Sequence, residues 1–138
     1  MAAPGPKPVP VPTKETQPYW DGCKKHELHI QKCADCGHHQ FYPRLYCTKC
    51  MSDKVNWIKA SGRATVLSYT IVYRPVTQAF SGDVPYVVAL VTLDEGPRMM
   101  TNIVDCDPDS VKIGQAVELV FHDTGQGTAL PRFRPAGA

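Results

Sequence analysis

The pattern of hydrophobic positions along this chain changes near residue 60. From there to the C-terminus, short runs rich in β-branched and aromatic residues alternate with turns rich in glycine, proline and aspartate, as in strands joined by short loops. This pattern predicts five strands, at Arg63–Tyr73, Tyr86–Leu93, Arg98–Val104, Ala116–His122 and around Leu130–Phe133. So short a stretch leaves no room for crossover helices, and we therefore expect a small antiparallel barrel.

The turn signals between these runs set how the strands connect. Asp94–Pro97 predicts a hairpin between the second and third strands. Asp107–Asp109 predicts a turn or a short helical turn that ends near Gly114, and Gly125 and Gly127 turn the chain before the last strand.

The N-terminal part of the chain has a different pattern. Residues 1–12 carry five prolines at alternate positions, which excludes a helix or a central strand and predicts an extended arm. The arm is either a disordered tail or a segment laid along a partner. Residues 13–29 begin with a candidate helix cap, Thr13, and are interrupted by Pro18 and Gly22, so we expect one or two short helical turns.

Composition and charge exclude several classes of protein. Hydrophobic residues make up 43% of the 138 positions, enough for a packed core, which excludes wholesale disorder. A net charge of +2 is too small to indicate a nucleic-acid or membrane-surface protein by itself. No apolar run approaches the roughly 20 residues that cross a bilayer, and the N-terminus lacks the apolar core of a signal peptide. We therefore expect a cytoplasmic protein, in which six cysteines need a role other than disulfides.

Four of the cysteines have the spacing of a metal site. Cys33, Cys36, Cys47 and Cys50 form the pattern C-x2-C-x10-C-x2-C, in which each two-residue gap lets both thiolates of a tight turn face one ion. Gly37 fits a turn that needs a positive φ. The pattern predicts one closed, structural zinc ion per chain, because four thiolates leave no open position for substrate or water. A redox dithiol or an iron site remains as an alternative.

The other cysteines and the histidines give weaker signals. His38 and His39 lie inside the loop of the cysteine pattern, but with four sulfurs available we expect them to be solvated or to support the ligands. Cys106 ends a predicted strand, where a small buried residue is common, and a catalytic pair with His122 is not favoured. Cys23 stands alone, and no nucleophile motif, phosphate loop or carboxylate pair is present.

The chain also resembles a known protein family, in a series of runs with the same order and spacing: PYWDG, KCADCG, YPR, CTKC, SGRATVLSYTIVYRP, VPYVVALVTLDEGPR, KIGQAVELVF and PRFRP. That family joins a rubredoxin-like zinc ribbon to an acyl-CoA-associated OB-fold domain, after a short N-terminal helical segment. The similarity covers residues 17–135, and one small departure is Ala64, where a second glycine is expected after the turn at Gly62.

The resemblance implies a domain organisation and a mainly β fold. We expect a flexible proline-rich arm at 1–12, a helical segment at 13–29, a zinc ribbon at 30–58, and a five-stranded antiparallel OB-fold barrel with a C-terminal extension at 59–138.

The resemblance further implies an accessory subunit that has no catalytic residues of its own. Such subunits assemble into hetero-oligomers with enzymes that act on coenzyme A thioesters, cover part of the active-site approach and help to hold or pass the acyl-CoA. Their partners include thiolases, hydroxymethylglutaryl-CoA synthase with acetoacetyl-CoA thiolase, polyketide-type acetyltransferases, and sterol side-chain hydratases and aldolases. We expect a thiolase partner here, and a thiolase acting on an aromatic β-oxoacyl-CoA such as benzoylsuccinyl-CoA fits this description.

Candidate binding residues follow from charge and position. Arg74, Arg98, Arg132 and Arg134 are candidates to contact coenzyme A phosphates. Core packing is favoured over adenine stacking for most of the aromatic residues Tyr69, Tyr73, Tyr86 and Phe133. Tyr19, Trp20 and Phe133 lie in short segments that flank the predicted modules, and are candidates for the partner interface.

Two other classes of function compete with the accessory subunit. Zinc ribbons and OB-folds also bind single-stranded nucleic acid through basic grooves with aromatic platforms, although the low net charge and the acidic predicted loops disfavour this function. The third class is a redox protein with iron on the same four thiolates.

Overall fold

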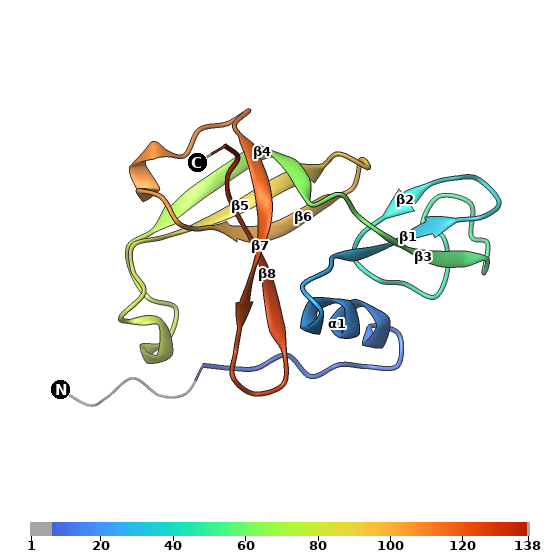
Figure 1. The fold of residues 1–138 in the computed structure, drawn as a ribbon, viewed down its shortest axis with the longest axis horizontal. Helices are drawn as coiled ribbons and strands as arrows, with labels where there is room; N and C mark the ends of the chain where they lie inside the picture. The colour runs from blue at the N-terminus through green and yellow to red at the C-terminus, as the bar shows by residue number, and fades with distance from the viewer. Residues whose placement is uncertain (1–6, 138) are drawn as a thin grey trace.

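The structure is a computed structural model and describes residues 7–137. A small sheet lies beside a larger barrel, with one α-helix next to them (Figure 1). The small sheet has the strand order β2-β1-β3, with β1 at His29–Cys33, β2 at His39–Gln40 and β3 at Val55–Lys59. The larger sheet is a closed barrel with the order β4-β5-β6-β8-β7. The predicted mainly β architecture is confirmed.

The barrel strands cover the segments that the hydrophobic pattern predicts. They are Arg63–Val72 (β4), Tyr86–Leu93 (β5), Arg98–Ile103 (β6), Ala116–Asp123 (β7) and Ala129–Pro135 (β8). Neighbouring strands are antiparallel, except that β6 and β8 meet in parallel at Ile103 and Phe133, where the barrel closes. The last strand extends past the predicted segment because its pairing with β7 continues to Pro135.

Two short 3-10 helices lie in the longer connections of the barrel. The first, η1 at Gln78–Phe80, lies between β4 and β5. The second, η2 at Pro108–Ser110, lies between β6 and β7, where the Asp107 carboxylate accepts a hydrogen bond from the Asp109 amide at 2.9 Å. This cap confirms the predicted helical turn.

The turn before the barrel differs from the expectation in one detail. Gly62 has a φ of +86°, a conformation that L side chains rarely adopt, and glycine is therefore favoured at this position. Ala64, where the resemblance leads us to expect a second glycine, lies inside β4 and outside the turn, with its side chain buried and its backbone paired with Leu93 and Val117.

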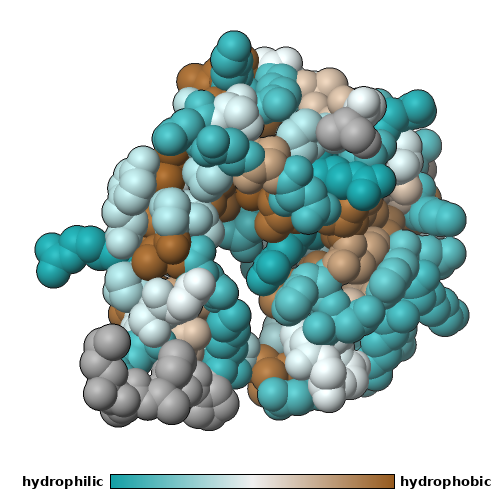
Figure 2. Space-filling view, turned by 60° about the vertical axis from the view of Figure 1, so that its left-hand side comes forward, coloured by the Kyte–Doolittle hydropathy of each residue, from teal (hydrophilic) through white to brown (hydrophobic). Residues whose placement is uncertain are grey.

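One hydrophobic core joins the barrel to the N-terminal elements. Inside the barrel, side chains such as Val66, Val91 and Phe133 are buried. Leu28 and Ile30, at the base of the small sheet, belong to the same cluster. On the side of the molecule in Figure 2, hydrophilic residues cover most of the surface, hydrophobic residues gather in smaller areas, and a hollow opens in the lower half.

The α-helix α1, at Gln17–Lys24, is a single element although two helix breakers lie in it. Pro18 is tolerated because it occupies the first turn, where a backbone N–H has no partner within the helix. Packing favours glycine at residue 22, because a Cβ there would overlap the imidazole of His29 unless that ring moved. The helix can therefore approach β1 closely.

The predicted arm is described only from residue 7. Residues 7–12 contain neither helix nor strand, and Lys7 forms an ion pair with Asp83 at 2.6 Å. The rest of the arm, residues 1–6, lies outside the described residues. Within residues 7–137, no helix has both the length and the apolar character needed to cross a bilayer.

Candidate functional site

The four predicted thiolates converge at the end of the small sheet. Their sulfur atoms all lie within 4.8 Å of one another, with Cys33 and Cys50 at 3.6 Å and Cys36 and Cys47 at 3.6 Å. A tetrahedral zinc ion with Zn–S bonds of about 2.3 Å places its sulfurs about 3.8 Å apart. The residues present therefore fit a four-thiolate zinc site, as the sequence predicts.

We call each of the two C-x2-C turns a knuckle. In each knuckle, backbone amides point at a cysteine sulfur. The Cys36 amide points at the Cys33 sulfur, and the amides of Lys49 and Cys50 point at the Cys47 sulfur, at 3.4–3.5 Å. The hydrogen bonds from the amides of Cys50 and Lys49 lower the pKa of the Cys47 thiol to about 6. These amides favour the thiolate form that binds a metal.

The residue after each knuckle has a left-handed conformation. Gly37 has a φ of +76°, and Met51 takes the matching place in the second knuckle with a φ of +69°. The two knuckles thus repeat one backbone shape, although only the first has the glycine that the shape favours. His38 and His39 are not in the ligand group, and His38 lies near the hydroxyl of Thr48.

Two buried glutamines hold the loop between the knuckles. The Gln31 side chain donates to the Arg44 carbonyl and accepts from the Arg44 amide, both at 2.8 Å. The Gln40 side chain donates to Gln31 at 2.8 Å and accepts from the Thr48 amide at 2.9 Å. We did not predict these residues from the sequence, where the only signal was a polar residue at an inward position of each strand.

The zinc ribbon exposes a set of large apolar side chains, three in this loop and one, Met51, after the second knuckle. We call it the ribbon surface, and it consists of Tyr42 (45% exposed), Leu45 (61%), Tyr46 (54%) and Met51 (74%). The guanidinium of Arg44 lies 5.6 Å from the centre of the Tyr42 ring. Tyrosine, methionine and arginine are enriched at protein interfaces.

The structure places the three candidate interface residues in different environments. Phe133 is fully buried in the barrel and Tyr19 is a buried residue of α1, so both side chains belong to the core. Trp20 is only partly buried. The ring centre of Trp20 lies 4.8 Å from that of Tyr19. The Tyr19 ring centre lies 5.6 Å from that of Phe41, which in turn lies 5.7 Å from that of Tyr42. This series of rings connects α1 with the ribbon surface.

The four candidate arginines do not form one site. Arg134 forms an ion pair with Glu118 at 2.9 Å, and Arg74 is exposed in the loop after β4. Arg98 is the first residue of β6, and Asn102, near the end of the same strand, lines a pocket. Arg98 therefore lies more than about 10 Å along the strand from that pocket. Only Arg132 lines the pocket. Of the candidate aromatic residues, Tyr86 also lines it, Tyr69 packs against the core and Tyr73 is exposed.

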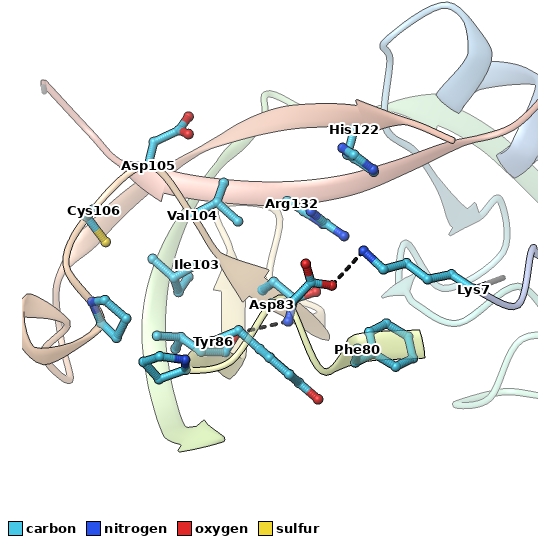
Figure 3. Close-up of a pocket in the computed structure, with 14 residues that line it drawn as sticks. Lys7, Phe80, Asp83, Tyr86, Ile103, Val104, Asp105, Cys106, His122 and Arg132 are labelled. Carbon is cyan, nitrogen blue, oxygen red and sulfur yellow. Dashed lines mark hydrogen bonds and ion pairs between the residues drawn. The ribbon is translucent and has the colours of Figure 1, made fainter. Parts of the chain in front are cut away.

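The pocket lies between the β4–β5 connection and the β7–β8 hairpin and has a volume of about 380 Å³ (Figure 3). Its wall combines apolar and charged side chains, including Phe80, Asp83, Ile103, Cys106, His122 and Arg132. Cys106 and His122 both line it, but no hydrogen bond joins them within the described residues. A catalytic pair of these two residues therefore has no support in the geometry.

Comparison with known protein families assigns both modules. Residues 20–56 match the family described as "ChsH2, rubredoxin-like zinc ribbon domain". Residues 57–122 match the family described as "ChsH2, C-terminal OB-fold domain". The two matches meet at β3, the last strand of the small sheet.

Individual relatives support the same assignment. A DUF35 domain-containing scaffold protein of Methanothermobacter thermautotrophicus is 42% identical over 99 residues, which cover 71% of this chain and 74% of the relative. The alpha subunit of a 3-oxo-4,17-pregnadiene-20-carboxyl-CoA hydratase of Mycobacterium tuberculosis is 37% identical over 115 residues. This match covers 83% of our chain, which spans only 36% of that subunit.

A solved structure agrees along nearly the whole chain. It is described as an Ltp2-ChsH2(DUF35) aldolase, and the matched chain has a TM-score of 0.83 and 36% sequence identity. The match covers 93% of this chain and 99% of that one. The likeness therefore includes the helix, the ribbon and the barrel.

Proposed function

This chain belongs to the family of zinc-ribbon and OB-fold proteins described as ChsH2 or DUF35 proteins, and we propose that it is an accessory subunit of an enzyme complex that transforms acyl-CoA. In this proposal the chain supplies a docking scaffold and covers part of the partner's active site. It has no acyl-CoA activity of its own.

The observation that carries the proposal is the agreement with the Ltp2-ChsH2(DUF35) aldolase chain over 99% of that chain's length. A module of similar size and architecture is thus present in a structure described as an aldolase. The relative described as a hydratase alpha subunit supports a second type of acyl-CoA enzyme as partner.

The metal site supports a structural role. Four thiolates complete the coordination shell that zinc prefers, so a bound zinc ion has no open position for a water molecule or a carbonyl oxygen. The ion instead replaces a hydrophobic core, which a ribbon of this size is too small to build.

The ribbon surface is the docking face that we assign to the enzyme subunit. A bound zinc ion and the Gln31–Gln40 hydrogen bonds would hold the backbone of the loop between the knuckles in place, so that the loop has its shape before a partner binds. Trp20 lies at the other end of the connected rings, and we retain it as an interface residue. We no longer assign this role to Tyr19 or Phe133, because their buried side chains cannot reach a partner.

The class of the partner is a hydratase, an aldolase or a thiolase. The names of the relatives favour the first two, whereas the resemblance in the sequence favours a thiolase, including one that acts on an aromatic β-oxoacyl-CoA. Because the four arginines do not converge, we propose that the partner holds most of the coenzyme A.

The test is purification of the tagged chain from its native host, followed by identification of the enzyme that copurifies in a fixed ratio. We expect an acyl-CoA hydratase, aldolase or thiolase, whose turnover falls when this chain is omitted and returns when it is added back. Activity of the purified chain alone would overturn the proposal. So would submicromolar binding of single-stranded nucleic acid at about 150 mM salt without any acyl-CoA enzyme in the preparation.

A further inference from the structure

The pocket beside the β7–β8 hairpin lies where OB-folds commonly bind ligands. In this fold the connection between the first two barrel strands and the hairpin of the last two frame the ligand-binding face. Here these elements are the β4–β5 connection, with Phe80 and Asp83, and the hairpin, with His122 and Arg132. A volume of about 380 Å³ lies within the range of small-molecule sites.

Arg132 points into this pocket from β8 (Figure 3). Its Nε atom is buried and has no hydrogen-bond partner, and no hydrogen bond or ion pair among the described residues uses its guanidinium group. Burial lowers the pKa of Arg132, while the nearby Asp83 carboxylate opposes that shift. Because Nε is too buried for a ligand in the pocket to reach, an oxyanion there would bond to the terminal nitrogens of the guanidinium through charge-assisted hydrogen bonds.

Arg132 contrasts with Arg134, two residues further along β8. The guanidinium of Arg134 donates to the Glu118 carboxylate at 2.9 Å. The Asp83 carboxylate, whose charge acts on Arg132, is already engaged, because it forms an ion pair with the Lys7 ammonium at 2.6 Å. The ammonium of Lys7 also lies 5.7 Å from the centre of the Phe80 ring, which places the end of the described arm at the pocket.

The other lining residues restrict the kind of anion. Lys7 and Arg132 are balanced by Asp83 and Asp105, so the wall carries no excess positive charge for a polyanion. Phe80, Tyr86 and Ile103 provide an apolar surface for the rest of the ligand. His122 lies on the same face of the hairpin as Arg132, because it is two residues from Val120, the partner of Arg132 in the strand register.

We propose that this pocket binds the carboxylate of a small organic acid with an aromatic or branched apolar body, and that Arg132 is the residue that binds the carboxylate. The planar guanidinium matches the two oxygens of a carboxylate. This ligand site belongs to the chain itself and goes beyond its proposed role as a scaffold. It does not depend on the identity or the presence of an enzyme partner.

The experiment is a titration of the zinc-loaded full-length chain, without partner, with phenylacetate and with its neutral isostere phenylacetamide. Calorimetry measures the affinity, and NMR of the ¹⁵N-labelled chain locates the site. We expect saturable binding of phenylacetate, with shifts at Tyr86, Asn102 and Arg132. The amide, which carries no charge, should bind at least about tenfold more weakly.

A pair of variants makes the test specific to Arg132. Arg132→Gln should weaken phenylacetate binding at least about tenfold, whereas Arg63→Gln, an exposed arginine of β4, should leave it within about twofold. Equal binding of acid and amide, shifts away from the pocket, or no effect of Arg132→Gln would overturn the proposal. Tighter binding of coenzyme A or inorganic phosphate than of phenylacetate would also overturn it, because the carboxylate class would then be wrong. If Arg132→Gln fails to fold, the positions of the NMR shifts in the wild-type chain still test the proposal.

Discussion

Cys47 shows how single groups prepare the metal site. Its buried sulfur accepts hydrogen bonds from two backbone amides, which stabilise the thiolate before a metal binds. We predict that Cys47→Ser loses about one zinc ion per chain, because a serine hydroxyl stays protonated and binds zinc poorly. Metal analysis by mass spectrometry measures the loss, and partner binding should fail in parallel.

The matched control is Cys106→Ser, because Cys106 lies outside the ligand group. It should keep its zinc and its partner. Full zinc content in Cys47→Ser would contradict the assignment of this ligand. Visible absorption by the metal in the purified wild-type protein would instead indicate iron.

Gln31 acts on the site without contacting the metal. Its side chain satisfies the amide and the carbonyl of Arg44 and receives a bond from Gln40. Gln31→Leu keeps the size of the side chain but leaves these polar groups without hydrogen-bond partners. Each such group that is buried costs about 1–3 kcal/mol of stability. We predict a loss of about 2–4 kcal/mol in the free energy of unfolding, measured by urea denaturation, together with faster loss of zinc to a chelator.

The neighbouring Lys32 provides a control for this prediction, because its side chain is exposed on the other face of β1. Lys32→Leu should change the free energy of unfolding by less than about 0.5 kcal/mol. Equal stability of both variants would show that the glutamine bonds do not hold the loop.

At the scale of elements, the contact between α1 and β1 depends on the absence of a side chain at residue 22. Gly22→Ala would favour the helix by up to about 1 kcal/mol, but its methyl group would overlap the His29 ring. We predict a net loss of about 1–3 kcal/mol, because overpacking displaces the helix from the strand. Thermal unfolding measures this loss as a lower midpoint temperature.

Gly82→Ala is the control for Gly22→Ala. A Cβ at Gly82 meets nothing within 4 Å, and its φ lies outside the positive range. We expect unchanged or slightly raised stability in this variant, since alanine restricts the unfolded chain. If Gly22→Ala is as stable as Gly82→Ala, the helix is free to move away from β1.

At the scale of the whole molecule, the ribbon surface should decide assembly. Leu45 is 61% exposed on this surface, and Ile113, 70% exposed on the β6–β7 connection, resembles it in size and exposure. We predict that Leu45→Ser weakens the complex with the copurifying enzyme by about 1–3 kcal/mol, whereas Ile113→Ser leaves the affinity unchanged. Co-elution and calorimetry measure the affinity of each variant for the enzyme. Equal affinities of the two variants would show that the ribbon surface is not part of the interface.

The sequence alone determined the parts of this protein that depend on local pattern. Alternating apolar residues and turn residues predicted all five barrel strands, because strand formation follows from a period that adjacent residues already show. The spacing of Cys33, Cys36, Cys47 and Cys50 predicted the ligand set, because a two-residue gap by itself brings two sulfurs to one ion.

Only the tertiary structure decided which residues are buried and which side chains meet. Phe133 and Trp20 have the same kind of sequence context, yet closure of the barrel by β8 buries the first and leaves the second partly exposed. Arg132 and Arg134 look alike in PRFRP, but Glu118 of β7 pairs with Arg134 alone, and Arg132 lines the pocket without a hydrogen-bond partner among residues 7–137. These differences arise from contacts between segments far apart in the chain, and no local pattern carries that information, because burial and pairing depend on what the fold places opposite each residue.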